Sequence, residues 1–148
     1  MEQHERLSGT EGFFAEGEGF FKTVLGSARR PEVFNTEVVH GLLCMALEKY
    51  AMALLSGLGE LPQNHTFADL VWSLKQCVPM SADMERTLLS LDEQSDLCSL
   101  EIRKPRIPER EELDRLIEMG KHLQAAAREV VVEGSKFPLA MESVVVVA

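Results

Sequence analysis

The chemistry open to this chain rests first on one arginine and one histidine. Arg115 and His122 have six residues between them, in a stretch whose apolar residues recur at helical spacing. A step of seven residues on a helix returns to nearly the same face. A histidine near a proton can act as a general base, and a fixed guanidinium can stabilise developing negative charge. The competing interpretation is a solvated helix face, on which Arg115 pairs with Glu111 one turn earlier.

A second candidate is the one concentration of positive charge in the sequence. Its members are Arg103, Lys104, Arg106 and Arg110. A basic loop beside a helix N-terminus is suited to holding a phosphate group. The alternative is a solvated charge run, in which these cations balance neighbouring carboxylates. Those carboxylates belong to Glu101, Glu109, Glu111 and Glu112.

Composition restricts the classes of function. A net charge of −9 over 148 residues argues against non-specific binding to DNA or RNA, because phosphate affinity comes from cations that release counterions. Any nucleic-acid site is therefore expected to be a local patch. The three cysteines, Cys44, Cys77 and Cys98, are far apart and form no Cys-x-x-Cys pair. The sequence thus predicts no metal site, no cofactor and a reducing compartment.

The elements that must position these residues are helices. Apolar residues at spacings of three and four predict an all-α, single-domain, up-and-down bundle of about five helices. The predicted helices are Phe13–Leu25, a second from Pro31 or Thr36 to Ser56, Thr66–Gln76, a fourth from Ser81 to about Leu97, and Glu109–Glu133. Residues 1–11 are expected to be a flexible N-terminus and residues 12–133 the bundle. Residues 134–148 form a C-terminal tail whose Val144–Val147 run is either disordered or packed in a groove or against a partner.

Local signals mark where these helices begin and end. Thr66 and Asp69 are placed like a capping box, and Ser81 is a good N-cap residue. Gly57 and Gly59 are expected to end the second helix. Gly17 and Gly19 are expected to weaken the first helix, since glycine costs up to about 1 kcal/mol relative to alanine in a helix.

The stretch from Thr36 to Gln76 carries a motif pattern. A helix of Ala-x-Glu-Lys-Ala-x-x-Ala-Leu-Leu character is followed by a short loop ending in Pro and x-His, then by a helix that in the family reads His-x-Leu-x-x-Leu. The matching residues are Ala46, Glu48, Lys49, Ala51, Ala53, Leu54, Leu55, Pro62, His65, Phe67, Leu70 and Leu74. This pattern resembles the HEPN (higher-eukaryote and prokaryote nucleotide-binding) helical-bundle family, with a weaker likeness over roughly Phe13–Val131. A lysine often found in the inward helix is replaced here by Met52.

The resemblance implies two kinds of function. Catalytically active HEPN proteins are metal-independent ribonucleases that use an Arg and a His, with four to six residues between them, in a cleft between two protomers. Arg115 and His122 would be that pair, although Leu116 stands where a polar residue commonly follows the Arg. Other members bind a nucleotide-like ligand or dock with a separately encoded minimal nucleotidyltransferase. His65 would then belong to a ligand-facing loop, or else satisfy the start of its helix.

We expect a homodimer and a non-catalytic HEPN-like module that binds such a ligand or docks with such a nucleotidyltransferase. The alternatives are the toxin-like ribonuclease, with RNA as its ligand, and a structural helical adaptor. Trp72 is expected at a dimer contact or at the core edge. The apolar segment Gly41–Leu55 is interrupted by Glu48-Lys49, short of the roughly 20 residues that cross a membrane. No secretory signal is recognisable, so we expect a cytoplasmic protein with no membrane partner.

Overall fold

The computed structural model describes residues 9–30, 32–62, 64, 66–95 and 108–141, and this part of the chain is helical without a strand. Its elements are α2 (Thr10–Gly26), the short 3-10 helix η1 (Ser27–Arg29), α3 (Thr36–Gly57), α4 (Phe67–Cys77), α5 (Ala82–Ser95) and α6 (Arg110–Val131). The predicted all-α bundle of about five helices is confirmed.

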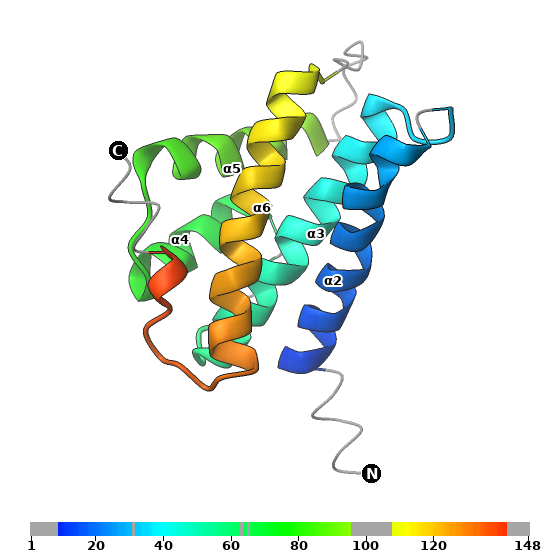
Figure 1. Ribbon diagram of the computed structural model, residues 1–148. Coiled ribbons are helices and arrows are strands. Elements are labelled where there is room, and N and C mark those ends of the chain that lie inside the picture. The colour runs from blue at the N-terminus through cyan, green and yellow to red at the C-terminus, as the bar shows by residue number, and fades with distance from the viewer. Residues whose placement is uncertain (1–8, 31, 63, 65, 96–107, 142–148) are drawn as a thin grey trace.

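Three long helices form the body of the molecule, and two shorter ones lie across one side of it. Figure 1 shows α2, α3 and α6 side by side, with α4 and α5 crossing beside α6. The chain runs along α2, returns antiparallel along α3, and is carried back by the α4–α5 pair. As a result α3 and α6 point in the same direction (Figure 1). The central helix is α3, which contacts α2, α4 and α6.

The centre of the bundle explains why α3 is so apolar. Its residues Ala51–Leu55 are all buried, and the helix contacts α2, α4 and α6. By length and hydropathy alone this 22-residue helix could cross a membrane, yet 56% of its most apolar window is buried inside the bundle. The expectation that the segment is too short for a membrane span is therefore wrong about length. A core helix of this kind has the same composition as a membrane helix.

The helix ends follow local rules. Thr66 caps α4 by accepting from the Asp69 amide at 3.2 Å, and its hydroxyl donates to the Asp69 carboxylate at 3.0 Å. Ser81 Oγ accepts from the Met84 amide at 3.1 Å, as its N-cap role predicts. At the start of α3 the cap is Asn35, whose side chain accepts from the Val38 amide at 2.9 Å. Beyond the end of α3, Gly59 has a φ of 80°, which favours glycine.

Close helix packing explains two glycines. A Cβ on Gly17 would lie 2.9 Å from the Tyr50 ring, and one on Gly120 would lie 2.8 Å from the Phe21 ring. Gly17 was expected only to weaken its helix, but here it lets α2 approach α3 closely. The contact depends on which ring lies opposite, so a single helix pattern does not reveal it.

The C-terminal segment is partly built into the bundle. Pro138 and Met141 are buried, and Met141 is wholly inaccessible to solvent. These two residues belong to the expected tail of residues 134–148, so the described part of that tail packs against the bundle. Val144–Val147 lie outside the described residues.

Candidate functional site

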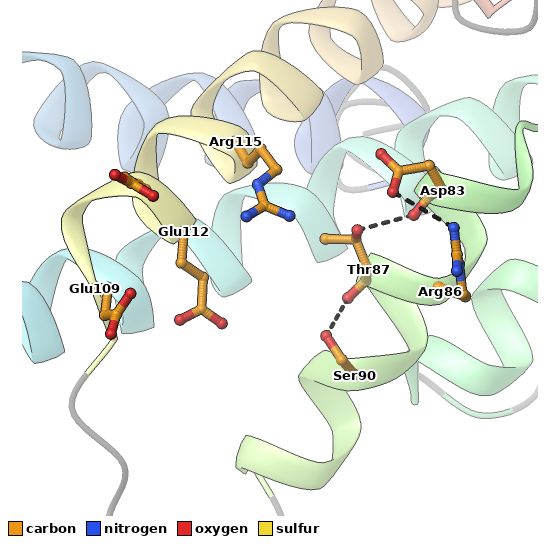
Figure 2. Close-up of a pocket in the computed structure, with 8 residues that line it drawn as sticks. Asp83, Arg86, Thr87, Ser90, Glu109, Glu112 and Arg115 are labelled. Carbon is orange, nitrogen blue, oxygen red and sulfur yellow. Dashed lines mark hydrogen bonds and ion pairs between the residues drawn. The ribbon is translucent and has the colours of Figure 1, made fainter. Parts of the chain in front are cut away.

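A polar cleft of about 400 Å³ lies between α5 and the first turns of α6. Figure 2 shows side chains from both helices facing it. Helix α5 contributes Asp83, Arg86, Thr87 and Ser90. Helix α6 and its N-cap contribute Glu109, Glu111, Glu112 and Arg115. The N-terminal halves of two helices thus meet here, where acidic side chains suit the helix dipoles.

The described side chains of the cleft are mostly charged or already engaged within their own helix. Four carboxylates and two guanidinium groups are among them. Its two hydroxyls donate to the backbone of their own helix: Thr87 to the Asp83 carbonyl at 2.8 Å and Ser90 to the Thr87 carbonyl at 2.6 Å. Arg86 lies 3.9 Å from Asp83 in an exposed ion pair (Figure 2).

Arg115 lies on the α6 side of the cleft. Its side chain extends toward Thr87 on α5 (Figure 2). The predicted Glu111–Arg115 ion pair does not form; the pair seen in this turn is Arg110–Asp114, at 3.9 Å. Arg115 thus shares the cleft with residues of the neighbouring helix, an arrangement that helix spacing alone does not specify.

His122 occupies the same edge of α6 but not the same site. Two turns of helix separate it from Arg115, roughly 10 Å along the axis, and it does not line the cleft. Its ring is partly buried and makes no hydrogen bond to any residue that the structure describes. One chain by itself therefore does not assemble these two side chains around a common reacting atom.

The remaining predicted site residues fall mostly outside the described part of the chain. This applies to His65, Arg103, Lys104 and Arg106. Arg110 is described: it is exposed in the first turn of α6 and faces Asp114 in the ion pair above. Among the described residues, no group of three or more His, Cys, Asp or Glu side chains is placed to hold a metal ion.

A polar contact inside the bundle was not anticipated from the sequence. Tyr50 on α3 is buried, and its hydroxyl donates to Glu18 Oε1 on α2 at 2.8 Å. Gln124 on α6 donates to the same oxygen at 2.7 Å. Burial first, and then the Glu18 carboxylate, raise the pKa of Tyr50 far above its ordinary value. The one signal in the sequence was an inward-facing tyrosine, because a buried hydroxyl needs a partner.

The motif residues of α3 divide between packing and polar contacts. Lys49 lies 2.9 Å from Glu16 and 5.5 Å from the centre of the Phe13 ring, so it joins α3 to α2. Cys44 Sγ lies 3.7 Å from His40 Nδ1. Burial, followed by the nearby Glu48 carboxylate, raises the pKa of the Cys44 thiol to about 12. Cys44 is therefore a protonated thiol near neutral pH, unsuited to nucleophilic chemistry.

The loop after α6, residues 132–141, presents large apolar side chains to solvent. Val132 and Leu139 are each 65% exposed, and Phe137 is 80% exposed. The Glu129 carboxylate nevertheless holds this loop against α6, because it accepts from the Leu139 and Ala140 amides at 3.1 and 3.0 Å. We call residues 132–141 the C-terminal loop. Its apolar side chains are exposed although its backbone is held in place.

No protein-family model, curated protein or solved structure matches this chain. The likeness to HEPN proteins accordingly rests on the motif residues of α3, α4 and the loop between them.

Proposed function

We propose that this chain is a non-catalytic helical module of the HEPN type, whose role is to dock with a separately encoded minimal nucleotidyltransferase. The partner class comes from the motif resemblance of α3 and α4. The observation that carries the docking role is the C-terminal loop, with Phe137 80% exposed beside Leu139. Exposed aromatic side chains on an ordered backbone are the usual anchors of a protein interface.

The way the loop is held favours recognition over disorder. Met141 is anchored in the core, and the Glu129 carboxylate fixes the preceding turn through two backbone amides. Little conformational entropy would then be lost when a partner covers Phe137 and Leu139. An ordered loop that exposes three large apolar side chains without a partner would lower solubility.

Docking is favoured over nucleotide binding by the contacts of the described cleft. Its two hydroxyls donate to carbonyls of their own helix and Arg86 pairs with Asp83, so these groups already have partners other than a phosphate. A nucleotide-like ligand would instead depend on Arg103, Lys104 and Arg106, which lie outside the described residues. Titration of the full chain with ATP tests that version separately, and we expect no binding at the α5–α6 cleft.

The experiment that tests docking uses a minimal nucleotidyltransferase encoded by a gene next to the one for this chain; absence of such a gene would itself count against the proposal. Isothermal titration of the full chain should give a specific complex, and the Phe137→Ala/Leu139→Ala variant should bind about 30-fold more weakly or worse. The matched control is Leu25→Ala/Val33→Ala, which removes apolar side chains of similar exposure, 49% and 56%, elsewhere on the surface. Absence of a complex, or an equal loss in the control, would overturn the proposal.

The ribonuclease hypothesis is kept as a second candidate because Arg115 forms no ion pair within the described part of the chain and shares a helix edge with His122. It requires metal-independent RNA cleavage that His122→Ala abolishes. We expect purified protein to leave RNA intact, since the two side chains lie roughly two helical turns apart. Cleavage that is lost in His122→Ala would replace the docking proposal with an enzymatic one.

A further inference from the structure

The outer face of α4 carries a large aromatic side chain that is exposed to solvent. Trp72 is 66% exposed, and at 100° per residue it lies roughly opposite the buried row of Phe67, Leu70 and Leu74. Of the two sequence-based interpretations, packing at the core edge is wrong. The side chain lies in the middle of the solvent-exposed face of α4, and most of its surface is open to solvent.

The charges around Trp72 are arranged symmetrically along the helix. Asp69 precedes it by three residues and Lys75 follows it by three, so both lie on neighbouring turns of the same face. Asp69 accepts from the Thr66 hydroxyl at 3.0 Å, and Lys75 lies 3.0 Å from Glu85. Each charge therefore has a neighbour of its own chain that fixes its position. An acid, an aromatic ring and a base form one row.

We propose that this row binds the same row of a second copy of the chain around a two-fold axis at Trp72. Such an axis reverses the row, so Asp69 of one copy faces Lys75 of the other and the reciprocal contact follows by symmetry. The two tryptophan rings then cover each other at the centre. Lys75 can contact Glu85 and the incoming carboxylate together, because an ammonium has three donors.

Charge complementarity selects a second copy as the occupant. A two-fold pairing of these rows brings opposite charges together at both ends, whereas a parallel pairing of two copies would place like charges together. The small side chain of Ala68, one turn before Trp72, leaves room for the neighbouring chain. This inference does not depend on docking with a nucleotidyltransferase, which uses a different surface.

The first test uses the fact that Trp72 is the only tryptophan. Its emission maximum should shift to shorter wavelength as the concentration of the full chain rises, in step with dimer formation in sedimentation equilibrium. Trp72→Ala should weaken the dimer about 30-fold or more, while Leu25→Ala, another exposed apolar truncation, should not. A chain that is monomeric at all accessible concentrations, or a dimer indifferent to Trp72→Ala, overturns the proposal.

The second test separates the interface from any loss of folding. Asp69→Lys and Lys75→Asp each place two like-charge contacts in a homodimer, and each should weaken it about tenfold. When the two variants are mixed, both contacts regain opposite charges, so heterodimers should form with affinity near that of the wild type. Destabilised monomers would not recover on mixing. If each variant loses the dimer and the mixture does not regain it, the two-fold arrangement is wrong.

Discussion

Replacing Tyr50 by phenylalanine tests the partly buried polar contact through which Glu18 joins α2 to α3 and α6. The substitution removes the hydroxyl that donates to Glu18 at 2.8 Å and keeps the ring between Phe14 and Phe21, whose centroids lie 6.0 and 5.8 Å away. A hydrogen bond to a charged group contributes about 1.5–3 kcal/mol to stability. For a chain of this length the melting temperature should therefore fall by about 3–12 °C.

The pH dependence of this effect has a definite sign. Because burial and the Glu18 carboxylate raise the Tyr50 pKa, the folded protein keeps the phenolic proton after the unfolded chain has lost it near about pH 10. The tyrosine contribution to stability is complete below that pH. It declines by about 1.4 kcal/mol per pH unit above it. The wild-type advantage over Tyr50→Phe should thus disappear within about two pH units above 10.

The assay is urea unfolding of both proteins, followed by circular dichroism from neutral to alkaline pH. Cys44 titrates in both proteins, so its contribution cancels in the comparison. Tyr50 is the only tyrosine, so tyrosinate absorbance reports on this residue alone. Tyrosinate should appear only as the chain unfolds. Its appearance near about pH 10 in a fully helical protein, or a deficit of Tyr50→Phe that persists unchanged at high pH, would refute the reasoning.

Two further predictions concern burial and packing. A variant with Cys44 as its only cysteine should react with iodoacetamide about a thousandfold more slowly when folded than in urea, since its pKa is raised from 9.0 to about 12; equal rates would contradict this. Gly120→Ala should destabilise the protein by about 1–3 kcal/mol through its contact with Phe21. Gly41→Ala, at a helix position with open space around it, should stabilise the protein by up to about 1 kcal/mol. If the urea midpoints of the Gly120→Ala and Gly41→Ala variants move in the same direction, the packing explanation is wrong.

The helices were predictable because their signals are local. The Thr66 and Ser81 caps and the apolar spacing of α3 depend on residues within one or two turns, and the structure places them as expected. The role of Gly17 was not predictable in this way. Glycine is needed there because the Tyr50 ring of another helix lies where a Cβ would be. Only the packed arrangement shows which residue lies opposite.

The candidate site was less accessible to sequence reasoning for the same physical reason. A charged residue on a helix has neighbours within its own helix and others across the packing interface, and spacing reveals only the first group. Arg115 was therefore assigned to Glu111, whereas it extends toward α5 (Figure 2). Glu18 and Gln124 are 106 residues apart in the chain, so no local pattern connects them to Tyr50.

The two hypotheses for self-association place the symmetry axis on different helices, which makes them separable. A ribonuclease cleft requires Arg115 and His122 of two copies to meet along α6, whereas the α4 surface places the axis at Trp72. A closed dimer has a single two-fold axis, and Arg115 faces α5 of its own chain (Figure 2). Loss of the dimer in Trp72→Ala, with RNA left intact by the wild type, would assign the axis to α4. A dimer that survives Trp72→Ala and cleaves RNA only while His122 is present would assign the axis to α6. One chain holds Arg115 and His122 apart, so in that case the reacting groups would have to come from two copies.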